Sequence, residues 1–274
     1  QKVLDINQDP NKPTTALPEL ILPTAQVELG LSIGNTWNYV GSMWAQYWTG
    51  GHGVSSTSLE YYTMTSADIQ TAWTRAYARC LADMDYLNKS DEVIYGGMSK
   101  IMSAYLYQML VDLHGDVPFT DAIKGLNADG SIGNTSPKYD TEREVYASLI
   151  PLIDSGVALL NKKGQINPKT AVQYVVPTSV DLIFAGDLNK WKVFANTLKL
   201  KILVRQGKTT EAKALMDTPG ITFVEAGEYV GWKPAQTTQN TNPLYARFES
   251  RTGIGMYYVA AKASIDKLSA MNDP

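Results

Sequence analysis

The chain of 274 residues is poor in cysteine, with Cys80 alone, and in histidine, with two residues. One thiol excludes a disulfide within one copy. Cys80 lies in an apolar helical stretch, where we expect a small buried core residue and not a reactive nucleophile. No run of about 18 apolar residues is present, so the sequence predicts no transmembrane helix. No signal peptide is recognisable at Gln1, as expected of a mature or shortened chain.

The sequence also lacks a concentration of positive charge. It has 24 Lys and Arg against 27 Asp and Glu, a net charge of -3, and its basic residues are scattered. A nucleic-acid partner requires a clustered positive surface that neutralises phosphates. A purely electrostatic membrane contact requires a run of Lys or Arg. We therefore expect neither nucleic acid nor an anionic lipid surface as a partner.

Motifs of the common catalytic sites are absent too: there is no nucleophile elbow, zinc-binding His-Glu-x-x-His, P-loop or dinucleotide fingerprint. His114 precedes Gly-Asp at a predicted helix end, which favours a structural hydrogen bond over base chemistry. Asp112 and Asp116 form a carboxylate pair of a kind that arises by chance in helical proteins. Residues 127–138 resemble a calcium loop, but Lys138 stands where the bidentate glutamate belongs. We predict no catalytic residue, cofactor or metal.

Tyrosine and tryptophan, in contrast, are abundant. The chain has 16 Tyr and 6 Trp against 5 Phe, with 44% apolar and 19% charged residues. The overall balance is that of a globular protein, and we predict a single domain over residues 1–274. Tyr and Trp have an apolar face and a polar group, which suits half-hydrated surfaces better than a purely structural core.

Helical periodicity is the clearest pattern. An apolar stripe over 69–87 follows Thr65 or Ser66, either of which can cap a helix. A second stripe over 94–113 begins after a short Asn-Lys-Ser-Asp link. Two helices joined so tightly are predicted to pack as an antiparallel hairpin.

Two more helices flank this hairpin. The first is predicted from Thr24 to Trp48, where a glycine-rich segment ends it. The other spans 141–160, because Thr and Glu at its start have capping-box spacing. Pro151 inside that helix is expected to kink or restart it.

The second half of the chain continues the helical pattern. Asp187 caps a predicted helix that ends at Gly207, and shorter helices are predicted over 209–217 and 255–271. Brief strands are predicted at 174–176, 221–224 and 229–232. Helical hairpins recur without an exact repeat. We predict a mainly α-helical fold of hairpins with tetratricopeptide-like packing, long irregular loops and few short strands.

Several short motifs span nearly the whole chain. They are Leu4-Asp5-Ile6-Asn7 with Asp9-Pro10-Asn11, Trp44-Ala45-Gln46-Tyr47-Trp48, Gly115-Asp116-Val117-Pro118-Phe119 followed by Pro137-Lys138-Tyr139-Asp140, and Asp181-Leu182-Ile183-Phe184-Ala185-Gly186-Asp187 leading into Lys190-Trp191 and Phe194-Ala195-Asn196-Thr197-Leu198-Lys199-Leu200. Each motif alone is weak, but in this order and spacing they resemble the SusD/RagB-like nutrient-binding lipoproteins of the Bacteroidetes.

The resemblance implies a helical protein on the extracellular face of the outer membrane, held by a lipid on a cysteine upstream of Gln1. Proteins of this kind cover a SusC-like TonB-dependent β-barrel and pass it oligosaccharides or, in some relatives, peptides. Members of the family usually continue well beyond Pro274. We therefore expect this chain to correspond to the N-terminal part of such a protein, without the C-terminal part of the family sequence.

Aromatic rings can cover the apolar C–H face of a sugar while a few polar groups bind its hydroxyls. Residues of both types follow the first predicted helix, and the resemblance implies ligand binding by aromatics of this region. The predicted ligand-binding residues there are Trp48, His52, Tyr61 and Tyr62. The alternative for Trp48 is a place in the helix core.

A second candidate site lies in a loop-rich stretch near the C-terminus. Trp232 offers a ring, and Arg247, beside Tyr245, can fork onto adjacent hydroxyls or a carboxylate. The alternative is an ordinary loop packed on the body of the protein. Three further tryptophans are interpreted as core residues of helices: Trp44, Trp73 and Trp191.

These observations predict a binding protein that delivers an oligosaccharide to a TonB-dependent transporter and catalyses no reaction. A peptide is the alternative nutrient. A helical glycoside hydrolase is a second alternative, which requires two carboxylates facing each other across a cleft. A tetratricopeptide-like scaffold that binds a protein segment in its concave face is the third.

Overall fold

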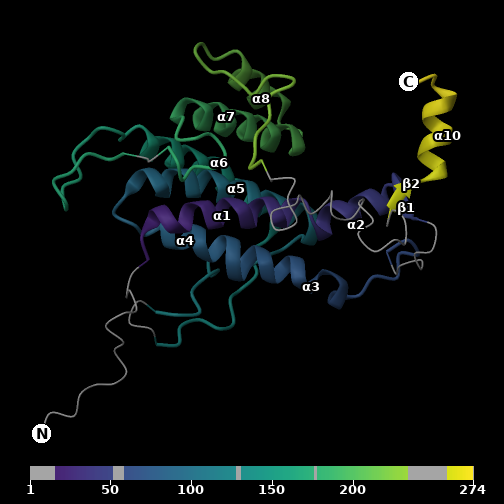
Figure 1. The fold of residues 1–274 in the computed structure, drawn as a ribbon, viewed down its shortest axis with the longest axis horizontal. Coiled ribbons are helices and arrows are strands. Elements are labelled where there is room, and N and C mark those ends of the chain that lie inside the picture. Colours follow the sequence, from purple (N-terminus) through teal and green to yellow (C-terminus); the bar gives the residue numbers. More distant parts are fainter. Residues whose placement is uncertain (1–15, 52–58, 128–130, 176–177, 234–257, 274) are drawn as a thin grey trace, which may run out of the picture.

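The computed structural model describes residues 16–51, 59–127, 131–175, 178–233 and 258–273. These residues are mostly helical, as predicted, with one two-stranded sheet (Figure 1). The helices are α1 (Pro18–Ile33), α2 (Thr36–Trp44), α3 (Ser66–Thr74), the π-helical segment η1 (Arg75–Leu81), α4 (Ala82–Asn88), α5 (Val93–His114), α6 (Glu142–Leu160), α7 (Leu188–Arg205), α8 (Thr209–Met216) and α10 (Lys262–Ala270).

Helix α5 forms the centre of the core. Apolar residues occur around its whole circumference, a pattern that requires burial on all sides. It packs against α4 and α6, and more narrowly against α1 and α7. The predicted hairpin of α4 and α5 is confirmed. The fully buried apolar residues of α5 are Ile94, Met98, Ile101, Met102, Ala104, Leu106 and Leu110.

Two glycines bring α5 and α6 into close contact. A Cβ atom added to Gly97 would lie 2.8 Å from the carbonyl oxygen of Gly156, and also 2.8 Å from Leu160 Cδ2. A Cβ on Gly156 would lie 2.8 Å from the carbonyl oxygen of Gly97. Neither position has room for a side chain, so the two backbones themselves form the contact.

The predicted helix starts at Thr65, Thr141 and Asp187 are confirmed by their capping hydrogen bonds. The backbone N–H of Thr65 donates to the Asp68 carboxylate (2.7 Å) at the start of α3. At α6, Thr141 N–H donates to the Glu144 carboxylate at 2.9 Å, and the reciprocal bond is 3.3 Å. These bonds satisfy amide groups that lack partners within the first helical turn.

The first predicted helix is wrong in its extent. Instead of one helix from Thr24 to Trp48, α1 begins at Pro18 and α2 ends at Trp44. Proline suits the first helical position because its missing N–H needs no partner there. Gly34 and Asn35 separate the two helices, and Asn35 has a non-helical conformation.

Trp48 is therefore a strand residue. Residues Trp48–Gly50 form β1, which pairs antiparallel with β2 (Tyr258–Ala260). This pairing also shortens the last predicted helix, which begins at Lys262 and not near residue 255. Helix α10 carries no buried residue and stands apart from the other helices (Figure 1).

The other predicted strands do not form in the described residues. Near 174–176 there is only an isolated bridge between Ile166 and Gln173. Residues 221–224 bond to side chains of α7: Asn196 donates to the carbonyl of Thr222, and Val224 N–H donates to a threonine hydroxyl. The segment 229–232 is likewise irregular.

Pro151 does not restart the helix that contains it. Helix α6 is continuous from Glu142 to Leu160. A proline in a helix removes one backbone hydrogen bond. Leu149 and Ile153, on either side of it, are fully buried and hold the helix against the core. The helix over 66–88 is also continuous, but η1 gives it a wider π-helical section.

A buried carboxylate joins three parts of the fold. Asp181 accepts hydrogen bonds from Gln26 Nε2 of α1 and from Trp191 Nε1 of α7, each at 2.8 Å. Its oxygens also accept from the backbone N–H groups of Ile183, Phe184 and Gly186. The interpretation of Trp191 as a core residue is confirmed, since its side chain is fully buried.

A second buried carboxylate closes the loop between α5 and α6. Asp140 accepts the backbone N–H of Phe119 (3.0 Å) and of Thr120 (2.7 Å), and forms an ion pair with Lys138 (3.1 Å). Burial by itself would raise the pKa of Asp140. The bonds from the Thr120 amide and hydroxyl, Lys138 and the Phe119 amide outweigh it and lower the pKa to about 2.

Within the described residues, no helix combines the length and the apolar character needed to cross a membrane.

Replacing Gly97 by Ala should destabilise the protein, because the added methyl group meets backbone and Leu160 at 2.8 Å. Overpacking of this kind costs about 1–3 kcal/mol. Urea unfolding followed by circular dichroism would measure it. Gly41→Ala is the matched control, since a Cβ there meets nothing within 4 Å and Ala favours a helix. Equal stability changes in the two variants would contradict this packing.

The Asp140 carboxylate should make stability depend on pH. Its pKa is lower in the folded protein than the usual 3.8, so its contribution is present above about pH 4. That contribution is lost as pH falls toward 2. Free energies of unfolding of the wild type and of Asp140→Asn, measured from pH 5 to pH 2, should therefore converge as pH falls. A constant difference across this range would show that Asp140 is not the titrating group.

Candidate functional site

Four large aromatic side chains lie exposed where α2 ends and where the chain turns into α3. We call these residues, Trp44, Tyr47, Tyr61 and Tyr62, the aromatic surface. Trp44 is 41% exposed and the three tyrosines are 59–65% exposed. Large rings in water mark binding surfaces when they gather in one place.

Hydrogen bonds hold two of these rings in fixed positions. Trp44 Nε1 donates to the carbonyl of Leu59 (3.1 Å), and the Tyr62 hydroxyl donates to the carbonyl of Trp44 (3.2 Å). The two rings are 5.9 Å apart at their centroids, with an interplanar angle of 38°. Their polar atoms are thus bound to the protein, while much of each ring stays in contact with solvent.

The backbone at the aromatic surface is strained. Gln46 has a φ of 59° and Tyr62 a φ of 56°, both in the left-handed region. For residues other than glycine this region costs about 1–2 kcal/mol each. Hydrogen bonds from Gln46 N–H to Met43 O (2.9 Å) and from Tyr47 N–H to Ser42 O (2.8 Å) hold the first turn. Strain of this kind is frequent at functional sites.

Glu60 fastens the turn before α3 to the strand β1. One of its carboxylate oxygens accepts the hydroxyl of Thr49 (2.7 Å) and the backbone N–H of Gly50 (2.6 Å). The two segments that carry the aromatic surface are therefore joined next to the exposed rings of Tyr61 and Tyr62. Such charge-assisted bonds are stronger than those between neutral groups.

Trp48 lies beside this surface but is half-buried. Its ring is nearly parallel to that of Tyr258 on the partner strand, at 6.4 Å and 16°, and Tyr258 also stacks with Tyr39. The structure thus brings Tyr61 and Tyr62 together, with Trp48 on the adjoining strand. His52 and Arg247 lie outside the described residues, and their assignment as ligand-binding residues stays a prediction.

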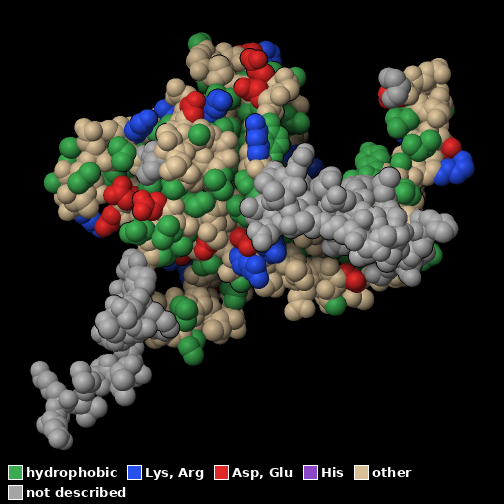
Figure 2. All heavy atoms as spheres, viewed as in Figure 1, with side chains coloured by type: hydrophobic (Ala, Val, Ile, Leu, Met, Phe, Trp, Pro, Cys, Tyr) green, Lys and Arg blue, Asp and Glu red, His purple; other side chains and the backbone are tan. Residues whose placement is uncertain are grey.

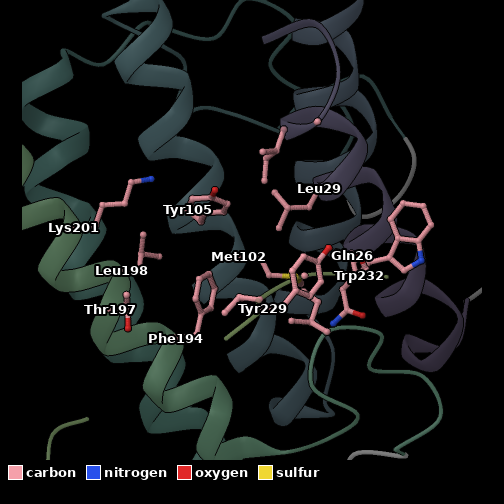
Figure 3. A pocket seen from close by; sticks show the side chains of 16 residues that line it. Gln26, Leu29, Met102, Tyr105, Phe194, Thr197, Leu198, Lys201, Tyr229 and Trp232 are labelled. Carbon is pink, nitrogen blue, oxygen red and sulfur yellow. Dashed lines mark hydrogen bonds between the residues drawn. The ribbon is translucent and has the colours of Figure 1, made fainter. Parts of the chain in front are cut away.

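Trp232 lies in a separate groove between α1, α5 and α7 (Figure 3). The groove has a volume of about 410 Å³ and mostly apolar walls. Tyr229 projects into it, and its hydroxyl donates to the carbonyl of Trp232 (2.7 Å). Lys201 Nζ lies 4.8 Å from the centre of the Tyr105 ring, and burial lowers the pKa of this lysine.

Two residues of the aromatic surface were missed by the sequence-based prediction. Trp44 was interpreted as helix core, which is wrong because α2 ends at this residue and leaves the ring exposed. Tyr47 was assigned to the same helix but follows its end. Trp73, another predicted core tryptophan, packs against the core and also lines a cavity.

Three features of the described residues bear on catalysis. No three His, Cys, Asp or Glu side chains in the described segments are grouped to hold a metal ion. Cys80 is buried, and burial raises the pKa of its thiol. Burial also lowers the pKa of His114, whose ring packs against Trp37 and Trp73.

A family model described as SusD-like, starch-binding and associating with the outer membrane matches residues 10–274. No curated protein matches the chain in sequence.

Solved structures share the fold. A SusD/RagB family protein from Bacteroides thetaiotaomicron is 24% identical, with a TM-score of 0.71 over 95% of this chain and 53% of that one. A SusD homolog from Bacteroides uniformis is 18% identical, with a TM-score of 0.71 over 92% and 53%. A chitin-binding protein is 22% identical, with a TM-score of 0.67 over 94% and 53%. The chain spans about half the length of these relatives.

Removing the Glu60 side chain should loosen the aromatic surface without altering a ring. In Glu60→Ala, the N–H of Gly50 loses its acceptor. We expect faster amide hydrogen exchange at 49–50 and 59–62, by roughly tenfold for each 1.4 kcal/mol of lost protection. Glu211→Ala, an exposed change on α8, is the control for charge. Unchanged exchange in these segments would show that Glu60 does not fasten them.

Proposed function

Since the chain belongs to the SusD-like family of starch-binding proteins that associate with the outer membrane, we propose that it binds an oligosaccharide there and delivers it to a transporter. The proposed contact is the aromatic surface. A pyranose ring has an apolar C–H face, which can lie on a tyrosine or tryptophan ring. A few polar groups then bind the hydroxyls at its rim.

The observation that carries the proposal is the pair of exposed rings of Trp44 and Tyr62 on a fixed backbone, with the exposed rings of Tyr47 and Tyr61 nearby in sequence. The strained turns at Gln46 and Tyr62 hold the chain so that the rings remain in water. A preformed surface binds with a smaller loss of side-chain entropy, because its rings are already ordered. Within this proposal, Trp48 and His52 extend the surface beyond Tyr61 and Tyr62, while Trp232 and Arg247 provide a separate contact.

Charge also favours a neutral ligand. Basic and acidic side chains are both spread over the face seen in Figure 2, without a broad patch of one sign. An anionic or cationic polymer would meet no complementary field on this face. A neutral glycan needs none, because stacking and hydrogen bonds supply its binding energy.

We propose that the ligand is released unchanged. The description of the family gives binding of starch, and this supports the proposal. A helical glycoside hydrolase would need two carboxylates facing each other across a cleft. Two carboxylates close in sequence to Tyr61 and Tyr62, those of Glu60 and Asp68, are both engaged by backbone N–H groups.

The family's association with the outer membrane supports the proposed location. There the protein would be held on the extracellular face by a lipid on a cysteine upstream of Gln1. Its partner would be a SusC-like TonB-dependent barrel, which receives the oligosaccharide. Co-purification of that barrel from outer membranes would test the partnership.

Replacing Tyr61 by Ala should weaken oligosaccharide binding. The ring is 65% exposed, so its loss should not affect folding. Loss of one stacked ring is worth about 0.5–1.5 kcal/mol, or roughly three- to tenfold in Kd. Isothermal titration with maltohexaose and chitohexaose, chosen because relatives are described as binding starch or chitin, would measure it. Tyr61→Phe should bind nearly as well as the wild type, and Trp48→Ala should also bind more weakly.

Met216→Ala is the control, because this side chain is 58% exposed on α8, away from the aromatic surface. If Tyr61→Ala and Trp48→Ala both bind like the wild type, the proposed site is wrong. Binding of library peptides but of no glycan would favour the peptide alternative. Shortened sugar products in the same samples would instead favour the hydrolase.

A further inference from the structure

We propose that a second cavity is an additional binding site for a neutral oligosaccharide. It lies toward the end of the α3–η1 helix that is farther from the aromatic surface. This cavity has a volume of about 1070 Å³. Its walls are one face of the helix that runs through α3, η1 and α4, together with loop residues from 118–126 and 134–139. The proposal rests on the proposed function, since it assigns the same ligand class to a site that the aromatic surface does not include.

Aromatic rings form one wall of this cavity. Trp73 and Tyr139 are nearly parallel, with 6.4 Å between ring centroids and an angle of 13°. Tyr77 lies next to Trp73 at 4.7 Å and 38°. Tyr139 is 61% exposed, although it belongs to a loop that is otherwise fixed at Asp140. This arrangement offers ring faces to a ligand in the same way as the aromatic surface.

Two tyrosines of the lining, Tyr77 and Tyr86, use their hydroxyl groups in hydrogen bonds to the protein. Tyr77 donates to the carbonyl of Pro118 (2.8 Å), and Tyr86 donates to the carbonyl of Ala16 (2.5 Å). Burial raises the pKa of Tyr77, so its hydroxyl remains a donor at physiological pH. These two rings are therefore held in place in the wall of the cavity.

The charges along the cavity are compensated in pairs. Lys124 lies 3.3 Å from Asp121, and Lys89 lies 2.5 Å from Asp85. The remaining polar lining comes from neutral side chains of the loop at 134–136, an asparagine, a threonine and a serine. Because these two lysines and two aspartates cancel in charge, the lining favours no ligand charge of either sign, whereas a neutral polyol can bond to the neutral side chains.

The cavity is preformed. The bonds of Asp140 to Phe119 and Thr120 close the base of the loop, and Asn134 N–H donates to the carbonyl of Lys124 (2.7 Å) across it. On the other wall, η1 places Tyr77 in a π-helical turn. π-Helical turns are rare in proteins, and those that occur often lie at functional sites.

Helix α3 connects the two sites. It begins at Ser66, four residues after Tyr62 of the aromatic surface, and Trp73 is near its end. Trp73 is seven positions after Ser66 along the helix, a rise of about 10 Å. Two contacts on one rigid element can bind one glycan chain with more avidity than either alone.

Fluorine NMR of protein labelled with 3-fluorotyrosine would test this site. The Tyr139 and Tyr61 signals are assigned by Tyr139→Phe and Tyr61→Phe, and maltohexaose and chitohexaose are the probes. We expect the Tyr139 signal to shift on addition of a hexasaccharide, and to do so also in the Tyr61→Ala variant. In Trp73→Phe, the concentration needed for half of the shift should rise about three- to tenfold.

The outcomes separate the two proposals. If the Tyr61 signal shifts and the Tyr139 signal does not, the second site is overturned and the proposed function stands. If only the Tyr139 signal shifts, the second site stands and the aromatic surface is overturned. The third outcome is that neither signal shifts with either sugar, while circular dichroism shows that the Tyr139→Phe and Tyr61→Phe variants used for assignment are folded. In that case this proposal is overturned together with the assignment of the aromatic surface.

Discussion

Near-complete burial of helix α5 between Ile94 and Val111 is the constraint on which the rest of this structure depends. A helix with apolar residues around its whole circumference must be covered on every side. Helices α1, α4, α6 and α7 supply that cover, and the glycine contact between α5 and α6 sets the closest approach. With the core occupied largely by aliphatic and methionine side chains, many tyrosines and tryptophans are left at the margins of the bundle, where function can use them.

Loops of this protein are held by carboxylates. Asp181 joins α1, the loop before α7 and α7 itself, while Asp140 closes the loop that forms one wall of the second cavity. Glu60 likewise joins the turn before α3 to strand β1 at the aromatic surface. A carboxylate oxygen that accepts several N–H groups satisfies donors that would otherwise be costly to bury. Rigid loops result, and rings mounted on rigid loops are ready to bind.

Much of the helical architecture could be predicted from the sequence, because its signals are local. Thr141 with Glu144 identifies the start of α6, and Asp187 identifies the start of α7. The pairing of Trp48 with Ala260 could not be predicted, since it joins segments more than 200 residues apart. The exposure of Trp44 depends on where α2 ends, and helix ends are less certain than helix existence. Tyr61 and Tyr62 were recognised because they follow a helix end in a polar loop.

The central claim is that the exposed rings at the end of α2 hold a sugar without changing it. A crystal structure of the protein with the hexasaccharide that binds most tightly tests this claim most directly. The account predicts an intact glycan with a pyranose face about 4 Å from a ring of the aromatic surface, the distance of van der Waals contact. An ordered glycan bound only elsewhere, with Trp44, Tyr61 and Tyr62 still in solvent, would contradict it.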